Sequence, residues 1–466
     1  MIVFTVITLL AISFLGLLLA QILKPRASSL EHISLSYLLG LGLLTFTLFV
    51  SNFLGLPYSG TNVALIYLGL TIVAVTINFN LKLFSVAALT NSLNHLLKTY
   101  HSLSRGEKVC MWLLVFIMVW VVLFSSYWPV KDWDSIVLYD FRAHMFLGQG
   151  FMDTSIPESY LYGYPLLTSL AHMLVYITGH QYPGIMHALF YVSFVMLFYV
   201  FVRSKISRSK ALFWTLLFSL SSNLIGHAYM TYTNLAYVVY LVLGLLYLFE
   251  WVDQKNKSDL VLSGLLIGLS TWARSAEPFW VLPIIVVVIV SLKNRDWWPV
   301  LWFPVFVKLF GYVWQLYKNR QNAIISVLQP PSLTPTVVAP VDYSQVLSLS
   351  HLLTVLQYYI TNSVVPDWDL YLCLVLICTI LYFSYKKKEK IKSIHLIILS
   401  VILTCVAVSM GGVFIFSFTY SEWQNIGSSL TRMMLFLGPL TFYLSTLVVS
   451  EVFEHNKNVI RYLRRK

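Results

Sequence analysis

The chain has 466 residues, of which 58% are hydrophobic and only 11% are charged, and its formal net charge is +12. Soluble domains usually carry about 25% charged residues, so this composition excludes a soluble globular protein and indicates an integral membrane protein. The apolar runs are continuous and lack the period-2 alternation of outer-membrane strands, which predicts helices. The basic residues lie in short connections between these runs, where they set topology, and no basic aromatic stretch indicates a nucleic-acid partner.

Thirteen apolar runs are long enough, or nearly so, to cross a membrane as helices. We therefore expect an all-α, polytopic transmembrane helical bundle of about 13 spans, with outer-face loops and interfacial helices. The first run lacks a basic n-region and a small-residue cleavage site, which predicts a retained span. The runs cover residues 2–20, 34–50, 61–79, 109–127, 184–202, 211–225, 234–251, 259–274, 279–292, 298–314, 368–385, 393–413 and 430–450.

Basic residues cluster in alternate connections between these runs, beginning with Lys24 and Arg26. Because basic loops stay in the cytoplasm, we expect a plasma-membrane protein with its N-terminus outside and its C-terminus cytoplasmic. Most acidic residues of the remaining connections then fall on the outer face. We divide the chain into N-terminal transmembrane helices with an inner-surface helix (1–108), a transmembrane core with an outer loop at 128–183 (109–451), and a basic cytoplasmic tail (452–466).

Shorter segments between the spans are also assigned. Leu166–Tyr176 is apolar but too short to span, so we expect a helix lying along the outer interface. His351–Ile360 is predicted to be another interfacial helix. Asn319–Ser350 is rich in proline, which favours an extended outer loop over a helix. The four cysteines have no metal-ligand spacing, so we expect neither a disulfide nor a zinc site.

The segment from Trp128 to Pro165 is the longest polar interruption in the N-terminal half of the chain. Ionisable groups beside a membrane core are costly and indicate function. The segment is therefore the first candidate for a functional site. Its carboxylates are Asp132, Asp134, Asp140, Asp153 and Glu158.

We expect a helix from Asp134 to Leu147, on which Asp140 and His144 share a face because they are four residues apart. Asp134 either caps this helix or serves as a placed base, and the two roles are compatible. His144 is either structural or functional. Arg142 points away from Asp140, toward Asp153, Glu158 or a bound phosphate.

Two further groups of residues allow two interpretations each. Tyr160, Tyr162 and Tyr164 form either an aromatic belt at the lipid headgroups or a surface for sugar or lipid contact. Arg274 either pairs with Glu277 to close a helical hairpin or faces an anionic ligand.

Three positions in the second half of the chain are also candidates. Arg432 either snorkels to the headgroups or binds an anion. Lys308, within a predicted span, requires a partner that the sequence does not identify. Asp367, Asp369 and Glu422 are alternatives for a second carboxylate at the site.

Several known motifs are missing from the sequence. No phosphate-binding GxxxxGK[ST] loop is present, which argues against an ATP-driven pump, and neither HExxH nor GxSxG occurs. Inverted halves with paired broken helices, which are typical of transporters, are not evident.

Four elements resemble the GT-C superfamily of membrane glycosyltransferases, to which protein O-mannosyltransferases and the lipid A aminoarabinose transferase belong. They are the Trp133-Asp134 helix with Arg142, the Tyr164-Pro165-Leu-Leu stretch, the span from Ser263 to Arg274 with its two glycines, and the Arg432–Pro439 element. Two features depart from the best-known members. Four of the predicted spans precede the outer loop instead of one, and Ser135 follows Asp134 where an acid is usual, so a second acid must come from Asp132 or Asp140.

The resemblance implies an inverting glycosyltransferase that moves a sugar from a polyprenyl-phosphate donor to a glycan, lipid or protein acceptor on the outer face. It implies catalytic roles for Asp134, as general base, and for Asp140 and Asp132. Phosphate binding falls to Arg432, Arg274 and Arg142, and substrate binding to His144, Glu158, Tyr164 and Glu277. No cofactor is implied, although an aspartate-rich loop could hold a divalent cation. The alternatives are a transporter or flippase, and a polymerase, of lipid-linked glycans.

Overall fold

The computed structural model describes residues 2–83, 98, 100–151, 162–275, 278–328, 348–364, 376–377, 379–380, 393–419 and 423–465. Every secondary-structure element that these residues form is a helix, as the sequence predicts. Internal contacts divide the chain into unit 1 (Met1–Pro330) and unit 2 (Pro331–Lys466), and each unit is described by itself. The functional division at residues 108 and 451 stays a prediction.

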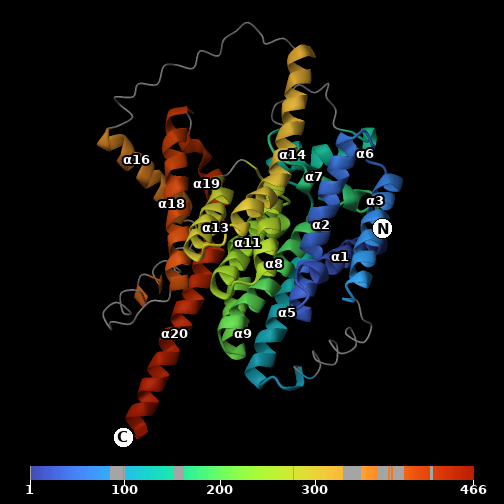
Figure 1. Cartoon of the computed structure of the whole chain (residues 1–466). Helices are drawn as coiled ribbons and strands as arrows, with labels where there is room; N and C mark the ends of the chain where they lie inside the picture. Colours follow the sequence, from blue (N-terminus) through green and yellow to red (C-terminus); the bar gives the residue numbers. More distant parts are fainter. Residues whose placement is uncertain are drawn as a thin grey trace. The chain divides into compact units, whose positions relative to one another are not determined.

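Unit 1 is built from helices of very different lengths (Figure 1). Its elements are α1 (Ile2–Leu23), α2 (Ser29–Phe53), α3 (Gly60–Asn80), α5 (Arg105–Ser125), η1 (Ser135–Asp140), α6 (Phe141–Gln149), α7 (Leu167–Tyr176), α8 (Gly184–Lys205), α9 (Arg208–Ser219), α10 (Ser222–Tyr229), α11 (Thr233–Gln254), α12 (Lys257–Ala273), η3 (Pro278–Trp280), α13 (Val281–Asn294) and α14 (Trp298–Leu328). Those of unit 2 are α16 (Leu349–Tyr359), η4 (Ile360–Val364), α18 (Ser393–Thr419), η5 (Trp423–Ile426), α19 (Gly427–Met433) and α20 (Leu437–Arg465).

Within the described residues, eight helices are long and apolar enough to cross a membrane, by length and composition. They are α1, α2, α3, α5, α8, α11, α14 and most of α18, and the α9–α10 pair, bent by 57°, makes a ninth if it counts as one span. The predicted spans at 259–274 and 279–292 correspond to shorter helices, of 17 and 14 residues. The run at 368–385 lies mostly outside the described residues, so the count of thirteen stays a prediction.

Helix starts follow local sequence signals. Ser28, Ser59 and Ser104 each accept a hydrogen bond from the backbone amide three residues later, which stabilises the first turns of α2, α3 and α5. At α5 the Glu107 side chain also accepts from the Ser104 backbone, which completes a capping box. These polar caps explain why the three helices begin where they do.

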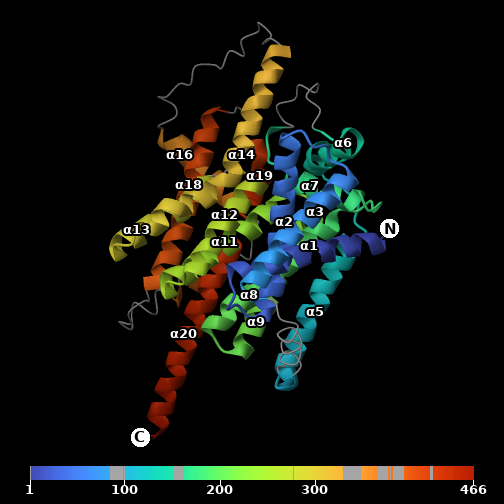
Figure 2. The same cartoon turned by 45° about the vertical axis from the view of Figure 1, so that its right-hand side comes forward.

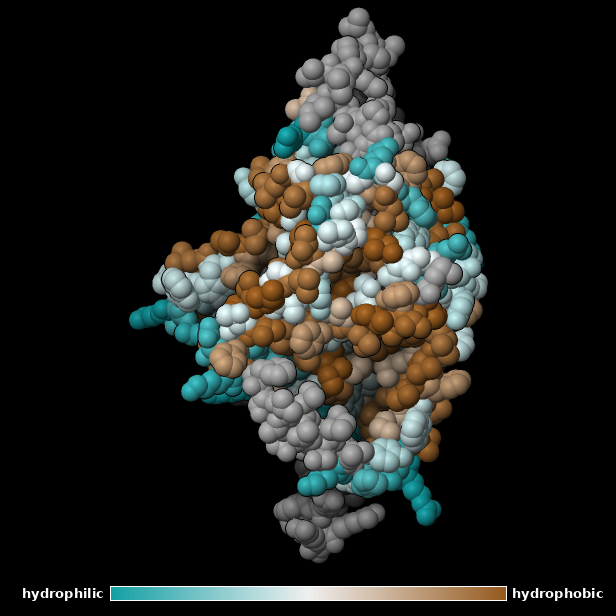
Figure 3. Space-filling model, turned by 90° about the vertical axis from the view of Figure 1, so that its right-hand side faces the viewer, coloured by the Kyte–Doolittle hydropathy of each residue, from teal (hydrophilic) through white to brown (hydrophobic). Residues whose placement is uncertain are grey.

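Helix α11 is the centre of unit 1, and every residue from Thr233 to Trp251 is buried. Two tyrosines tie it to α2: the Tyr240 hydroxyl donates to the Leu38 carbonyl at 2.7 Å, and the Tyr247 hydroxyl donates to Glu31 at 2.8 Å. Helix α3, by contrast, exposes Leu65, Leu68 and Ile72 among other large apolar residues. Figure 3 looks onto the side where α1 and α3 lie, and hydrophobic residues predominate over its middle, as expected of a lipid-facing surface.

Glycines allow two close helix contacts. A Cβ added at Gly16 in α1 would overlap the Ser36 carbonyl of α2, and one added at Gly40 would overlap the Ile12 carbonyl of α1. Small residues let helix backbones approach closely inside a membrane. In the same way, Gly264 and Gly268 face aromatic residues of α14. The two glycines of the Ser263–Arg274 span therefore have a packing role.

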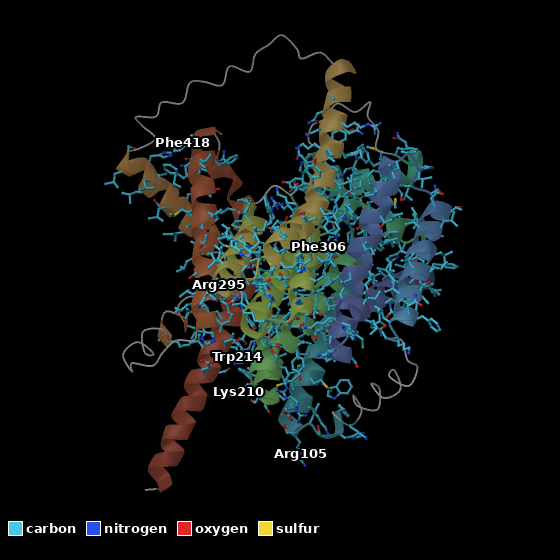
Figure 4. The ribbon with its side chains drawn as sticks, in the orientation of Figure 1. Arg105, Lys210, Trp214, Arg295, Phe306 and Phe418 are labelled. Atoms are coloured by element: carbon cyan, nitrogen blue, oxygen red, sulfur yellow. The ribbon has the colours of Figure 1, made fainter. Side chains whose placement is uncertain are left out.

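Polar groups gather at both ends of unit 1. Helices α6 and α7 lie at one end, whereas α9 and the start of α5 lie at the other, in both views (Figures 1 and 2). Arg105 and Lys210 are labelled at this second end in Figure 4. Three cations there are paired with acids: Lys24 with Glu31 and Asp259, Lys205 with Glu250, and Arg208 with Glu107. The basic end therefore also holds acids, and the separation of charge by side is less complete than the sequence pattern suggests.

Two expectations about connecting segments are corrected. Helix α7 is the predicted short helix, but every residue from Leu167 to Val175 is buried, so it is enclosed by other helices and does not lie on a surface. Helix α14 continues to Leu328, so the predicted extended loop cannot begin at Asn319. Helix α16 corresponds to the predicted helix at 351–360. The predicted inner-surface helix at 80–103 falls largely outside the described residues.

The α1–α2 contact yields a first prediction. Gly16→Val should destabilise the protein by about 1–3 kcal/mol or more, because the new side chain meets backbone that cannot move aside. Gly69→Val in α3 is the matched control, since a Cβ there meets nothing within 4 Å. Thermal unfolding in detergent measures both variants. Equal losses of melting temperature in the two would contradict a specific close contact.

Candidate functional site

The predicted helix from Asp134 to Leu147 is present as η1 followed by α6. Its first part is a π-helix, in which the Phe141 amide donates to the Ile136 carbonyl five residues earlier. Such π-turns are often found at functional sites. Asp134 itself has helical dihedral angles and its carboxylate makes no capping hydrogen bond. The capping interpretation of Asp134 is therefore wrong.

The end of α6 is anchored to the α2–α3 connection. Gly150 ends the helix with a positive φ of 75°, a conformation that favours glycine. Its carbonyl accepts hydrogen bonds from the Tyr58 amide at 2.7 Å and from the Asn52 side chain at 3.0 Å. At the other side, the buried Ser135 hydroxyl accepts from Thr231 at 2.9 Å, just before α11. The helix that carries the candidate carboxylates is thus fixed at both ends.

One group of side chains, which we call the Tyr139 cluster, comprises Tyr139, Arg142, Tyr164, Arg274 and Asp134. The Arg274 guanidinium lies 5.3 Å from the centre of the Tyr164 ring and donates to Asn234 at 2.8 Å. The Arg142 guanidinium lies 5.6 Å from the centre of the Tyr139 ring. Residues from η1, α6, the 162–166 segment and the end of α12 thus come together, although 140 positions separate the first from the last.

Arg142 and Tyr162 have no exposed surface. Arg142 is fully buried and donates from Nη1 to the Tyr164 carbonyl at 2.8 Å, so it holds the Tyr-Pro element in place. Tyr162 is also fully buried, which rules out an aromatic-belt role for it. Tyr160, like Asp153 and Glu158, lies outside the described residues.

Burial and nearby charges both act on the pKa of Tyr139. Burial raises the pKa of Tyr139 far above its ordinary value. The charges of Arg274 and Arg142 act in the opposite direction on this pKa, whereas the Asp134 carboxylate adds to the rise. The geometry of the cluster rests on its ring contacts, which bring Arg142 to Tyr139 and Arg274 to Tyr164, and on Asp134, which precedes Tyr139 on the same helix.

A second group, the Asp140 cluster, comprises Asp140, His144, His172, Tyr176 and His187. The Tyr176 hydroxyl donates to the Asp140 carboxylate, while His144 Nε2 and His172 Nδ1 lie 3.5 and 3.6 Å from its oxygens. The predicted shared face of Asp140 and His144 is confirmed. His172 Nε2 lies 3.2 Å from His187 Nε2, so a chain of polar groups runs from the carboxylate into the core.

Burial and hydrogen bonding act in opposite directions on the pKa of Asp140. Burial raises the pKa of Asp140, but the nearby His172 and His144 imidazoles and the hydrogen bond from Tyr176 outweigh it, so the pKa lies below its ordinary value. Burial lowers the pKa of the fully buried His172, and its interaction with Asp140 only partly offsets this. At neutral pH the pair is therefore a carboxylate beside a neutral imidazole.

This protonation state determines the direction of the chain of hydrogen bonds. The charged Asp140 carboxylate only accepts, so His172 carries its proton on Nδ1 and presents Nε2 as an acceptor. His187 must then donate from Nε2. The buried pair of imidazoles orients the carboxylate and stabilises its charge.

A cavity of about 480 Å³ opens beside the Asp140 cluster. Asp140, His144 and Tyr176 line one side, and His180 and Gln181, between α7 and α8, line another. The side chain of His144 is 61% exposed and that of Asp140 is 17% exposed, so both are accessible from the cavity. Among the residues that line this cavity, Asp140 is the one with a carboxylate side chain.

The remaining predicted residues lie elsewhere or outside the described part of the chain. Asp132 precedes η1 and is half-buried. Arg432 lies in α19 of unit 2, where its neighbour Thr431 donates to the Asn362 carbonyl. Lys308 Nζ lies 3.5 Å from the centre of the Trp280 ring, which supplies the partner that the sequence left unnamed. Four further predicted carboxylates also lie outside the described residues, namely Glu277, Asp367, Asp369 and Glu422.

Sequence reasoning missed His172, Tyr176 and His187. His172 lies within the apolar stretch 166–176 and His187 within the run 184–202, where a histidine is unusual, and that was the available signal. No group of three or more His, Cys, Asp or Glu side chains in the described ranges is arranged to hold a metal ion. The described residues therefore provide no argument for a divalent cation in the outer loop.

The buried imidazole of His172 yields a second prediction. Its pKa is lower in the folded protein than in the unfolded chain, so the unfolded chain binds more protons as pH falls below about 6.5. Stability should therefore decline from pH 7 to pH 5, and His172→Gln, which cannot titrate, should flatten this decline. The control variant His101→Gln, which removes an exposed imidazole, should leave this decline unchanged. Melting temperatures in detergent test this, and equal slopes in wild type and His172→Gln would contradict it.

Comparisons with protein-family models, with curated proteins and with solved structures find no match for this chain. An assignment of function therefore rests on the residues themselves. The Tyr139 cluster, the Asp140 cluster and the cavity occupy the same end of unit 1, and they form the candidate functional site.

Proposed function

We propose that the protein is a membrane glycosyltransferase of the GT-C type, which transfers a sugar from a polyprenyl-phosphate donor to an acceptor hydroxyl with inversion. The observation that carries the proposal is the Tyr139 cluster. It brings the Arg142 guanidinium to the Tyr139 ring and the Arg274 guanidinium to the Tyr164 ring, beside the helix that carries Asp134. A reaction that removes a proton and releases a phosphate requires both kinds of group.

In the proposed reaction the Asp134 carboxylate takes the proton of the acceptor hydroxyl, and the hydroxyl oxygen forms a bond to the anomeric carbon. The bond from that carbon to the phosphate oxygen breaks on the opposite side, and its electron pair stays on the lipid phosphate. Arg274, half-buried at the end of α12, is positioned to stabilise that charge. Arg142 is fully buried and acts through Tyr164, so we assign it a positioning role.

The remaining predicted residues keep the roles that the resemblance implies. Asp132 and Asp140 are the candidates for a second acid, and Arg432 keeps the phosphate-binding role that the resemblance implies. His144 and Tyr164 belong to the two clusters and are proposed to contact substrate. Glu158 and Glu277 are proposed substrate contacts that lie outside the described residues. The acceptor is a glycan, a lipid or a protein.

The proposed transfer is tested by Asp134→Asn. General-base catalysis contributes about 10²–10⁴-fold, so this variant should lose transfer by that factor while retaining its melting temperature. The assay uses purified full-length protein in proteoliposomes, polyprenyl-phosphate sugars as donors and mass spectrometry of the products. Asp296→Asn is the matched control, because this exposed carboxylate lies between α13 and α14, outside both clusters. Near-normal turnover of Asp134→Asn would remove Asp134 from the mechanism.

The proposed orientation is tested separately. In a background without the four native cysteines, Lys131→Cys, beside η1, should react with a membrane-impermeant maleimide on intact cells. Lys257→Cys, at the start of α12, should react only after permeabilisation, because it lies with the basic clusters. The reverse pattern would place the candidate site in the cytoplasm and contradict an outer-face transfer.

Transport of a lipid-linked glycan is a second candidate function. The chain from Asp140 through His172 to His187 favours it, because carboxylate and imidazole chains carry protons in membrane transporters. The two functions differ in their product. A transporter moves the labelled glycan across the proteoliposome membrane without forming a new covalent bond, and it does so in Asp134→Asn as well. A polymerase would instead extend lipid-linked glycan chains in the same assay.

A further inference from the structure

The cavity beside Asp140 is distinct from the Tyr139 cluster, although Tyr139 and Asp140 are consecutive in η1. Its volume of about 480 Å³ lies within the range of about 300–1,000 Å³ typical of small-molecule sites. Part of its lining is apolar, from Pro129, Val130 and Leu147. An apolar wall with a few polar groups is the usual composition of a site for a small organic ligand.

The charge of the lining selects the kind of ligand. Asp140 is the acidic group of this lining, and the Tyr176 hydroxyl and the His172 imidazole stabilise its carboxylate form. A carboxylate in a partly buried wall repels a phosphate and accepts hydrogen bonds from hydroxyl groups. A neutral ligand rich in hydroxyl groups therefore fits this cavity better than an anion does.

The planar side chains that line the cavity add a second criterion for the kind of ligand that fits it. The His144 ring stacks on Tyr176 with 4.6 Å between ring centres and an angle of 15°, and the exposure of His144 leaves its surface open to the cavity. Tyr182 meets His180 edge-on at 5.6 Å. Flat rings suit the C–H face of a saturated ring, and Gln181 supplies both a donor and an acceptor for its hydroxyl groups.

We propose that the cavity beside Asp140 binds one pyranose-sized sugar ring, whose neighbouring hydroxyl groups donate to the Asp140 carboxylate. The inference rests on the proposed function for the source of this ring, which is either the lipid-phosphate donor or the acceptor glycan. In the first case the phosphate lies toward the Tyr139 cluster, whose central residue precedes Asp140 in η1. In the second case the ring is bound without any lipid phosphate.

The test is site-specific protection of Gln181→Cys, in full-length protein without native cysteines, reconstituted in nanodiscs. Labelling by a water-soluble maleimide is followed with three kinds of probe. They are methyl glycosides of glucose, mannose, galactose and N-acetylglucosamine, polyprenyl phosphates carrying the same sugars, and sugar-free polyprenyl phosphate. We expect at least one sugar-bearing probe to slow labelling about tenfold. Thr61→Cys, exposed at the start of α3 and outside the cavity lining, should be unaffected.

The probes distinguish the two sources. Protection by a methyl glycoside identifies the ring as an acceptor, whereas protection only by a lipid-linked sugar identifies it as the donor. Asp140→Asn should raise the concentration needed for half-protection about tenfold or more, because hydrogen bonds to a charged group are lost. His144→Ala serves as a second variant, and an unchanged melting temperature verifies that each variant is folded.

The inference is overturned if no sugar-bearing probe protects Gln181→Cys, or if sugar-free polyprenyl phosphate protects it equally well. Unchanged half-protection in both Asp140→Asn and His144→Ala would also overturn it. Failure of the proposed function is distinguishable, because protection is measured without turnover. Transfer without protection rejects the sugar-ring cavity alone, and protection without transfer rejects the glycosyltransferase alone.

Discussion

The contact between the Asp140 carboxylate and the buried His172 imidazole connects the parts of the candidate site. It links η1 to α7, and through His187 to α8. A carboxylate at the end of an apolar bundle is costly unless hydrogen bonds stabilise its charge. Here a neutral imidazole and the Tyr176 hydroxyl do so, and the low pKa of Asp140 is the consequence. The charged group is thereby held in one orientation beside a cavity.

The π-helix η1 places two chemically different groups on neighbouring residues. Tyr139 lies beside Arg142 and Tyr164, with Arg274 over the Tyr164 ring, whereas Asp140 lies among imidazoles and lines a cavity. A ligand that carries both a phosphate and a sugar has the same division, with one anionic part and one hydroxyl-rich part. The arrangement accordingly supports the proposed function and the proposed sugar-ring cavity through separate observations.

Sequence patterns predicted the local features of the site well. The i, i+4 spacing predicted the contact of Asp140 with His144, and the helix itself followed from a continuous pattern. The capping role of Asp134 failed because the helix begins before this residue, which has helical dihedral angles and makes no capping hydrogen bond. The short helix α7 was predicted from its length, but its burial was not, because burial depends on α2, α11 and α12 packing around it.

The sequence by itself determined a helical membrane protein, since continuous apolar runs with few charges have no other stable arrangement in lipid. It also identified Asp134, Asp140, Arg142 and Arg274 as unusual, because ionisable residues beside such runs are costly. Only the tertiary structure decided that Arg274 lies with Tyr164, and that His172 and His187 stand behind Asp140. Those contacts join residues far apart in the chain, and helix packing, which no local pattern encodes, brings them together.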